Sequence, residues 1–520
     1  MKKMRREVLK GVIIFGICCI LLSSGMLAEI VFKQGTDGSG DSWNGPINVI
    51  TNSNGRVWEA TGANIIAAIS DLGGYGKVTL PEGLIELSAD IDINVPGVEL
   101  CGAGMNSTIL KLTGGSFADD VIGIGYDGIA TACHNCTLRD FTLDCNDQTG
   151  WSGIGTYGAN DLVIDHVRVL NAKYSGIKVS ARDVGPPSVG YPNRVMITNC
   201  RIINFGTSGS SSHGISGAGC NATMSNIFVD NTDSEGLGLD AANSENCVFS
   251  NFIIHDCDGG GIKIDSTQRE CTGNVFTGFT ITGCGYDADY GPAVGVTGDT
   301  NGENCFSDFI IDDCKRGIAA YGGGGNSTFN NFHISNCGTK GAIMCLGNNY
   351  RFSNIFVNGH ANGLTQSDGV IQIGYSTSTT YGILLDNIHV YNVVDGSESV
   401  SGIRFYDAHD CLLTNVYLDG IDDDGIYIGF GSDKITILGG VIKDCGGNGI
   451  YVSTTGRNVT INSIQTYDIV DSADIHIGDT ADRFIVSNCI CEGNIDINAA
   501  ASGTRICSAD NNICASIVTS

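Results

Sequence analysis

The sequence predicts an all-β solenoid, in which short strands stack coil upon coil, and three observations support this prediction. One phrase recurs with changed letters, as Phe249-Ser-Asn-Phe-Ile-Ile-His-Asp-Cys257, Phe306-Ser-Asp-Phe-Ile-Ile-Asp-Asp-Cys314 and Phe329-Asn-Asn-Phe-His-Ile-Ser-Asn-Cys337. A second phrase, such as Gly261-Ile-Lys-Ile264, follows each copy a few residues later. The 520 residues include 74 glycines but only 7 prolines, and Gly, Asn, Asp and Ser separate short Ile, Val and Phe runs. Such repetition is typical of solenoids, which can lengthen without a wider core.

The first phrase contains a turn position, usually asparagine, that recurs in every coil. Asparagine tolerates the left-handed backbone conformation and can hydrogen-bond through its side chain, so it suits a tight turn between two strands. Stacked coils place these amides in a ladder, each satisfying the next. The predicted ladder positions are Asp140, His166, Asn199, Asn226, Asn251, Gly278, Asp308, Asn331, Asn354, Asn387, Asn415, Gly440, Ser463 and Asn488.

The second phrase predicts a strand that follows the loop of each coil. Its period-2 alternation turns Ile, Val and Leu inward and the residue between them outward. The copies of this phrase begin at Gly153, Gly176, Gly214, Gly236, Gly261, Gly317, Gly341, Gly402, Gly425 and Gly449. Loops of differing length flank the strand, notably Ser180–Asn193 and Ser376–Tyr381. Longer loops on one side of a β-helix commonly wall a groove.

The N-terminus carries the features of an export segment. Residues 1–28 combine a basic start, an apolar stretch and the small-residue end Ser23-Ser-Gly-Met-Leu-Ala28, which predicts a signal peptide or an uncleaved N-terminal membrane anchor. Residues 29–57 form a lead-in segment, and residues 58–515 form a single solenoid domain. Within the domain, Thr61–Leu72 has the spacing of a short amphipathic helix ended by Gly73-Gly74, and we expect it to cap the solenoid.

The segments after this helix carry a family resemblance. Lys77-Val-Thr-Leu-Pro-Glu-Gly83 and Val98-Glu-Leu-Cys-Gly-Ala-Gly104 resemble the N-terminal part of the pectate-lyase-like domain of rhamnogalacturonase and epimerase type. The repeats resemble the right-handed parallel β-helix of the pectin-lyase-like superfamily, and the resemblance runs from about Trp58 to the C-terminus. It implies a right-handed parallel β-helix with a short N-terminal capping helix. The superfamily includes lyases, hydrolases, epimerases, phage tailspikes and adhesins, so the fold alone does not choose among them.

The net charge and the predicted export limit the kinds of molecule that the protein can bind. The formal net charge of -28 repels phosphate backbones, so the sequence predicts no nucleic-acid partner. Export predicts an extracellular or cell-surface protein, with membrane attachment if the N-terminal segment stays uncleaved. The sequence also contains glycosylation triplets, at Asn106, Asn135, Asn221, Asn326 and Asn458.

The cysteines recur in register, and the sequence leaves two interpretations open. Cys257, Cys284, Cys314 and Cys337 each lie six residues after a ladder position, and Cys136, Cys247 and Cys411 share another register. Such columns fit buried thiols, and they equally fit disulfides between neighbouring coils in an exported protein. A disulfide between Cys507 and Cys514 is predicted near the C-terminal end. Cys133-His-Asn-Cys136 has no partner pair, so we expect no zinc site there.

Outward positions of the second-phrase strands contain the candidate site. Asp240 and Asp265 share one register on consecutive coils, and with Asp258 they form a candidate calcium site, because Ca²⁺ prefers oxygen ligands. Lys178 and Lys263 lie two residues nearer the strand start. In a polysaccharide lyase, the cation would bind the carboxylate of the substrate, and Lys178 or Lys263 would be the base. The competing interpretation is an ordinary solvated surface.

A glycoside hydrolase is the second enzymatic hypothesis. Asn231-Thr-Asp233 is similar to the Asn-Thr-Asp motif of polygalacturonase-type glycosidases, which implies a catalytic carboxylate at Asp233. Two expected partners depart from that pattern: the next coil reads Asp256-Cys-Asp258, and the similar histidine, His213, lies one coil before the motif. Glu235 joins His213 and Asp233 among the candidate catalytic residues, because all three come from the segments just before these strands.

The sequence therefore predicts an exported, carbohydrate-associated protein that binds a polysaccharide or cell-surface glycan. The sharper hypothesis is a lyase acting on acidic polysaccharide, and the hydrolase is its enzymatic alternative. A non-catalytic adhesin, surface-layer or tailspike-like rod is the alternative from another class. Downstream, Arg404, Tyr427, Tyr451 and His476 share the outward register, where tyrosines either contact sugar rings or simply favour strand structure.

Overall fold

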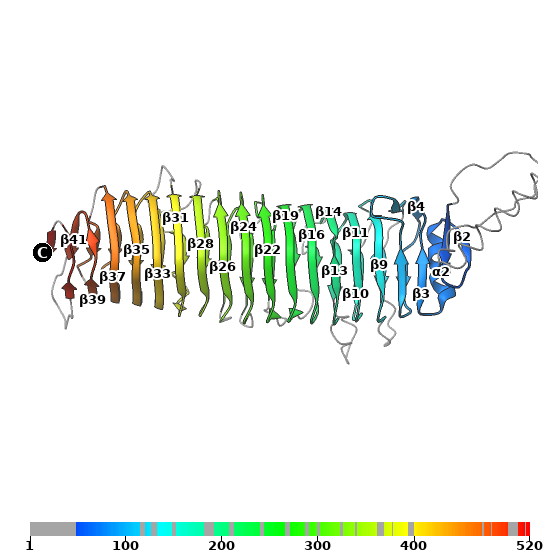
Figure 1. The fold of residues 1–520 in the computed structure, drawn as a ribbon, viewed down its shortest axis with the longest axis horizontal. Helices are drawn as coiled ribbons and strands as arrows, with labels where there is room; N and C mark the ends of the chain where they lie inside the picture. The colour runs from blue at the N-terminus through cyan, green and yellow to red at the C-terminus, as the bar shows by residue number, and fades with distance from the viewer. Residues whose placement is uncertain are drawn as a thin grey trace, which may run out of the picture.

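The protein is a long rod of about 14 stacked coils in a computed structural model (Figure 1). Strands of consecutive coils pair in parallel, and residues about two dozen positions apart become neighbours. The structure describes residues 48–114, 120–125, 133–147, 152–180, 192–206, 213–239, 244–265, 271–286, 291–298, 302–322, 326–338, 341–360, 369–376, 378–393, 400–470, 473–479, 481–497, 508–514 and 516–519.

Two long sheets run the length of the rod, and a small third sheet lies beside them. Sheet A contains β1 (Val49–Asn52), β2 (Val57–Glu59), β3 (Gly76–Thr79), β4 (Gly83–Leu87), β6 (Val98–Cys101), β7 (Thr108–Leu112), β9 (Thr137–Asp144), β11 (Val163–Ala172), β13 (Met196–Thr198), β14 (Arg201–Phe205), β16 (Thr223–Thr232), β19 (Val248–Cys257), β22 (Val275–Thr282), β24 (Cys305–Asp312), β26 (Thr328–Ser335), β28 (Arg351–His360), β30 (Thr380–Tyr381), β31 (Leu384–Val393), β33 (Ala408–Ile421), β35 (Asp433–Cys445), β37 (Arg457–Ile469), β39 (Asp482–Ser487), β40 (Ile490–Cys491) and β42 (Ser508–Asp510).

Sheet B contains the second-phrase strands. They are β5 (Ile91–Ile93), β8 (Ile122–Ile124), β10 (Ser152–Tyr157), β12 (Ser175–Ser180), β15 (His213–Ser216), β17 (Glu235–Gly238), β20 (Gly260–Asp265), β23 (Val294–Thr297), β25 (Ile318–Ala320), β27 (Ile343–Cys345), β29 (Gly369–Ile373), β32 (Ser401–Tyr406), β34 (Ile426–Gly429), β36 (Ile450–Val452), β38 (Ile475–Ile477), β41 (Asn494–Ile497) and β43 (Ser516–Thr519). The third sheet pairs β18 (Ser244–Glu245) with β21 (Cys271–Thr272).

The asparagine ladder forms as predicted. Asn226 Nδ2 donates to Asn199 Oδ1 at 3.1 Å, and Asn251 Nδ2 donates to Asn226 Oδ1 at 3.2 Å. These asparagines have φ between 54° and 56°, the left-handed conformation that the turn requires. One predicted position is wrong by a residue: Asn415 stacks on Gly439, because Val416 pairs with Gly440.

Two further columns of left-handed residues accompany the ladder, five positions before it and five after it. Asn221 and Asn231 flank Asn226 in this way, with φ values of 52° and 54°. The later column has its own side-chain ladder, since Asn231 Nδ2 donates to Asn204 Oδ1 at 2.6 Å. Each coil therefore turns at three regularly spaced points along sheet A, which explains why Asn, Asp and Gly recur in the sequence at intervals of five.

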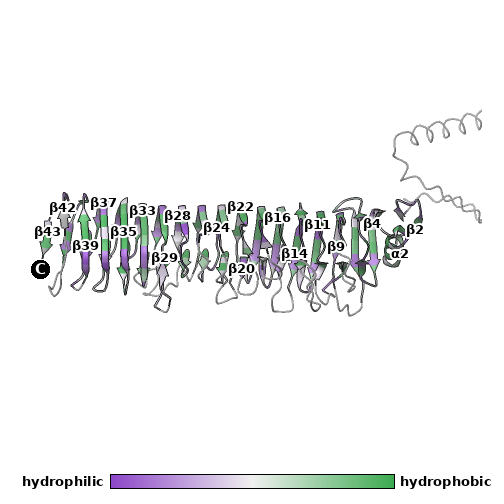
Figure 2. Ribbon diagram, turned by 90° about the horizontal axis from the view of Figure 1, so that it is seen from below, coloured by the Kyte–Doolittle hydropathy of each residue, from purple (hydrophilic) through white to green (hydrophobic). Residues whose placement is uncertain are grey.

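The core is built from columns of identical side chains. Phe306 lies between Phe276 and Phe329, with both ring centroids 4.6 Å away and the planes nearly parallel. A second phenylalanine column runs on the other side of the ladder, where Phe279 and Phe309 lie 4.8 Å apart. Along the strands, hydrophobic and hydrophilic residues alternate, so the strand ribbons change colour repeatedly in Figure 2.

The described cysteines are thiols, and most are buried. Many follow a left-handed turn residue directly and hydrogen-bond a carbonyl two positions back, as Cys200 Sγ does with Thr198 O at 3.1 Å and Cys284 Sγ with Thr282 O at 3.2 Å. Burial raises the pKa of Cys411 to about 12. The columns thus have the structure of buried thiols that satisfy turn carbonyls. Cys507, one half of the predicted C-terminal disulfide, lies outside the described residues.

The predicted cap is helix α2 (Gly62–Leu72), which lies at the N-terminal end of the rod in Figure 1. Thr61 caps it by accepting the backbone N–H of Asn64, and Gly73 ends it at φ 63°. Before the helix, β1 pairs antiparallel with β2 and β3, so the described end of the lead-in segment is ordered. Residues 1–28 lie outside the described part of the chain, within which no helix combines the length and apolarity needed to cross a membrane.

Candidate functional site

The candidate site lies on the outer surface of sheet B, along one row of residues. Lys178 pairs with Ser216, and Gly238 pairs with Lys263, so these four side-chain positions belong to four consecutive coils. We call them the site row. The predicted shared register of the two lysines is confirmed, and three steps separate them. At about 4.8 Å per step, that distance is about 14 Å.

A partly buried ion-pair cluster includes Lys263. Glu235 Oε2 is 3.1 Å from His213 Nδ1, and Glu235 Oε1 is 3.6 Å from Lys263 Nζ. The Ser234 hydroxyl donates to Oε2 at 2.6 Å. Burial by itself would raise the pKa of Glu235, but the contacts with His213, Lys263 and Ser234 together lower that pKa to about 2. The carboxylate is therefore ionised at neutral pH.

His213 and Glu235 occupy the first positions of β15 and β17, where they pair across one step. The sequence predicted that they lie in the segments before these strands; they lie instead within the strands, and strand pairing fixes the spacing between them. Only 1% of the His213 side chain is exposed. Its ring lies over Gly238, where an added Cβ would come within 2.6 Å of Nε2. Glycine at that point of the site row makes room for the imidazole.

A second polar cluster, not predicted from the sequence, lies beside Lys178. The buried Asp120 accepts the Tyr157 hydroxyl through Oδ2 at 2.6 Å and the Ser152 backbone N–H through Oδ1 at 2.8 Å. Burial raises the pKa of Asp120, although these hydrogen bonds and the charge of Lys178 oppose the shift. Asp120 lies over Gly155, where a Cβ would meet its carboxylate. The glycine in Gly153-Ile-Gly155 was the available signal in the sequence.

The two clusters repeat one arrangement three coils apart. In each, a buried ionisable residue lies over a glycine of the next coil, and a lysine follows one coil later in the same row. The first cluster contains Asp120, Gly155 and Lys178, in that order. The second contains His213, Gly238 and Lys263. The surface of sheet B thus offers two ammonium groups, each beside a buried acid–base group.

The remaining predicted residues do not join these clusters. Asp233 is exposed in the turn before Glu235, and Asn231 of the same motif is a ladder residue, so turn geometry explains that asparagine. Asp258 lies in the turn between β19 and β20, and Asp265 ends β20 in register with Thr297. Asp240, the proposed partner of Asp265, lies outside the described residues. Within the described ranges, no three His, Cys, Asp or Glu side chains are grouped as a metal site.

Farther along sheet B, the outward row becomes aromatic. Tyr427 pairs with Tyr451, and Tyr451 stacks on His476 with centroids 5.1 Å apart. The Arg404 guanidinium lies 4.6 Å from the centre of the Tyr427 ring. These rings mostly face one another along the rod, so their faces are largely covered. Nearby, burial and then the charge of Asp423 raise the pKa of the Asp424 carboxyl to about 6.

Comparisons with known proteins agree with the architecture. The family model described as "Right handed beta helix region" matches residues 123–294. The chain is a right-handed parallel β-helix. No curated protein sequence matches it.

Similar solved structures include ORF18 of Geobacillus virus E2, with 13% identity and a TM-score of 0.37 over 73% of this chain and 57% of that one. The chain thus spans little more than half of that protein. The A-module of the Azotobacter vinelandii mannuronan C-5 epimerase AlgE4 has 16% identity and a TM-score of 0.27, over 88% of this chain and 95% of that one. A PL6 alginate lyase in complex with a trisaccharide has 12% identity and a TM-score of 0.41, over 68% of this chain and 82% of that one.

Proposed function

We propose that this protein is an exported polysaccharide lyase that binds an acidic polysaccharide along the site row and cleaves it beside Lys263. The observation that carries the proposal is the partly buried Glu235 carboxylate, which lies within 3.6 Å of both His213 and Lys263. A carboxylate held between an imidazole and an ammonium group gives two functional groups fixed relative orientations at one point of the surface.

The lysine supplies the charge that an anionic sugar needs. Lys263 is the ammonium partner of Glu235 and keeps 37% of its side chain exposed, so it can contact a substrate carboxylate. An ammonium group there stabilises the negative charge that develops on the sugar when its C5 proton leaves. We therefore propose anion binding as the role of Lys263, in place of the role of base that the sequence suggested.

The imidazole is the group suited to take the proton. The Glu235 carboxylate lies 3.1 Å from His213 Nδ1, and its negative charge favours a proton on that nitrogen, which leaves Nε2 as the basic nitrogen. In the reaction, Nε2 takes the C5 proton, the C4–O4 bond breaks, and the electron pair forms the C4=C5 double bond. The departing O4 takes a proton from water. Since His213 is buried, this step requires that substrate gain access to its ring.

Lys178 extends the binding surface. It lies three steps along the row from Lys263, and the Asp120–Tyr157 pair beside it is anchored by a 2.6 Å hydrogen bond. A substrate long enough to contact both lysines gains a second charge contact. Calcium at Asp265, with Asp240, remains part of the proposal, as carboxylate oxygens are suitable ligands. Asp258 drops out of this predicted set, because it lies at the opposite end of β20 from Asp265.

The experiment follows the ultraviolet absorbance of the unsaturated product on a panel of polyuronates, with added calcium and with a chelator. Lys263→Ala and His213→Gln are expected to reduce the rate at least 100-fold. The matched control is Lys434→Ala, which removes another lysine from an ion pair, 3.1 Å from Asp410, on sheet A. Absence of absorbance change on every polyuronate contradicts the lyase, and release of reducing ends without absorbance supports the hydrolase.

One observation favours the non-catalytic rod. The His213–Glu235–Lys263 cluster satisfies its own charges, as structural ion-pair networks also do, and the ladders and ring stacks explain most of the sequence without any reaction. On this hypothesis Lys263→Ala leaves every glycan-dependent property unchanged.

A further inference from the structure

A groove on the outer face of sheet A is lined by both apolar side chains and arginines. It shares no residue with the site row on sheet B. Its volume is about 690 Å³, and it lies over the coils from Arg168 to Thr280. Met105 and Asn106 close it at one end. We call it the arginine groove, defined by Arg168, Arg201, Phe228 and Ile253 on the floor and by the ladder residues Asn199, Asn226 and Asn251 along one edge.

The floor is a row of outward residues in strict register. Arg168 pairs with Arg201, Arg201 with Phe228, and Phe228 with Ile253. Ile253 is 48% exposed, which is unusual for an isoleucine within a regular strand. The Arg201 guanidinium lies 5.7 Å from the centre of the Phe228 ring, so it is held near the floor.

The two arginines differ from the cations of this chain that form ion pairs. Arg56, Lys111, Arg139, Arg194, Lys434 and Lys443 all form ion pairs with Asp or Glu. Within the described residues, neither Arg168 nor Arg201 has a carboxylate partner. Arg168 donates to the Asn106 amide oxygen at 2.6 Å, and its buried Nε has no hydrogen-bond partner.

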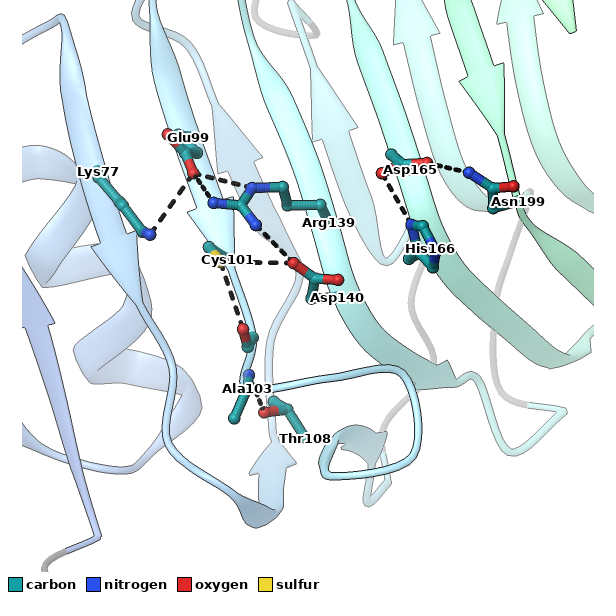
Figure 3. A network of polar contacts seen from close by, with 11 residues as sticks. Lys77, Glu99, Cys101, Ala103, Thr108, Arg139, Asp140, Asp165, His166 and Asn199 are labelled. Atoms are coloured by element: carbon teal, nitrogen blue, oxygen red, sulfur yellow. Dashed lines mark hydrogen bonds and ion pairs between the residues drawn. The ribbon is translucent and has the colours of Figure 1, made fainter. Parts of the chain in front are cut away.

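Three carboxylates of sheet A, on the coil of Arg168 and on the coils before it, are engaged with other residues, as Figure 3 shows. Glu99 and Asp140 both contact Arg139, at 2.6 Å each. Asp165 contacts His166 at 2.8 Å and accepts the Asn199 amide at 2.8 Å. In a chain with a net charge of -28, two arginines without carboxylate partners make a local positive site.

The edge of the groove offers neutral hydrogen-bonding groups. Each ladder amide donates one N–H to the preceding coil, as Asn251 does to Asn226. The second N–H of the amide and the remaining lone pair of its oxygen can then bond other partners. Amides at one-coil intervals suit a ligand with many hydroxyl groups, and the apolar floor suits the C–H faces of sugar rings. Guanidinium groups suit carboxylates, which they bind through two parallel hydrogen bonds.

We propose that the arginine groove binds an anionic oligosaccharide, with a uronate carboxylate on Arg201 and sugar hydroxyls on the Asn199–Asn226–Asn251 edge. The site is separate from the site row, so it goes beyond the proposed function and does not depend on catalysis there. Two bound segments on one rod would hold a polysaccharide chain at two places and lengthen its residence on the protein.

Calorimetric titration of the full chain with hexameric oligogalacturonate and oligoguluronate tests the proposal, and cellohexaose serves as the neutral comparison. Arg201→Ala is expected to weaken uronate binding at least tenfold and to remove one binding site from the stoichiometry. Arg201→Lys keeps the positive charge but cannot form two parallel hydrogen bonds to a carboxylate. Its affinity is therefore expected to lie between those of Arg201→Ala and the unmodified protein. Arg351→Ala is the matched control, because Arg351 is another exposed sheet A arginine without an ion pair in the described ranges.

Lys263→Ala separates this inference from the proposed function. It leaves the groove intact, so binding that persists in Lys263→Ala and disappears in Arg201→Ala supports the groove even if no lyase activity exists. Uronate binding unchanged by Arg201→Ala, or no uronate binding at all, overturns the proposal. So does concentration-dependent association of the rod that Arg201→Ala abolishes, since the occupant would then be a second copy of the chain.

Discussion

The same coils carry two different kinds of residue column, one in the core and turns of sheet A and the other on the outer faces of the sheets. In the first, like stacks on like: Asn226 lies between Asn199 and Asn251, and Phe306 between Phe276 and Phe329. In the site row, unlike residues follow one another, as Lys178, Ser216, Gly238 and Lys263. Columns of identical residues are explained by the stacking itself. A column that changes residue at each step needs another explanation, and function is one.

The largest test of this comparison removes a ring from a like-on-like column. Phe306→Ala leaves a cavity between two rings that are each 4.6 Å away, so we expect the free energy of unfolding to fall by about 3–5 kcal/mol. Chemical denaturation monitored by circular dichroism measures it. A loss below about 1 kcal/mol would show that the column is not the main source of local stability.

A smaller effect is expected in the ladder, where two causes can be separated. Asn354 has φ 53°, donates to Asn330 at 2.8 Å and accepts from Asn387 at 2.8 Å. Asn354→Ala places alanine in the left-handed conformation and removes both hydrogen bonds, so the free energy of unfolding should fall by about 2–3 kcal/mol. Asn354→Gly removes only the hydrogen bonds, so the free energy of unfolding, measured by the same denaturation, should fall by about 1 kcal/mol. Equal losses for the two variants would contradict a role for the backbone conformation.

Two carboxyls, one in β17 of sheet B and one just before β34, should respond to pH in opposite directions. The pKa of Glu235 is lowered from 4.5 to about 2, so its stabilising effect is complete above pH 4.5 and is lost as pH falls toward 2. The pKa of Asp424 is raised from 3.8 to about 6, so stability falls as pH rises from 3.8 to 6. The midpoint of unfolding, measured across this pH range, should no longer fall toward low pH in Glu235→Gln. It should no longer fall between pH 3.8 and 6 in Asp424→Asn. At pH 7, Asp424→Asn should stabilise the protein by an amount on the order of 2 kcal/mol. A destabilised Asp424→Asn at pH 7 would contradict the assignment.

The smallest effect belongs to an exposed ion pair. Lys434 and Asp410 are 3.1 Å apart, and both side chains are more than half exposed. Lys434→Ala should therefore change the free energy of unfolding by less than about 0.5 kcal/mol. A larger change, measured by the same denaturation, would mean that charge on sheet A also contributes to the rod, and the variant would no longer serve as a neutral control.

The sequence predicted the parts of the fold that depend on short-range chemistry. Asn at the tight turn and Thr61 and Gly73 at the ends of the helix each reflect local backbone needs, and the structure has them as predicted. Gly439 was confused with Gly440 because adjacent glycines hide the register. The Asp120–Tyr157 contact escaped prediction because a whole coil, which includes β9, lies between the two residues in the sequence, and only the stacked coils bring the pair together.

The most direct test of the account compares Lys263→Ala with Asn354→Ala in two measurements, the dissociation constant for a uronate hexasaccharide that fills the site row and the midpoint of unfolding. Both are made in an Arg201→Ala background, so that only the site row is titrated. The account predicts that Lys263→Ala weakens binding at least tenfold with an unchanged midpoint, whereas Asn354→Ala lowers the midpoint and leaves binding unchanged. Loss of stability without loss of binding in Lys263→Ala would contradict it, because the site row would then be one more structural column.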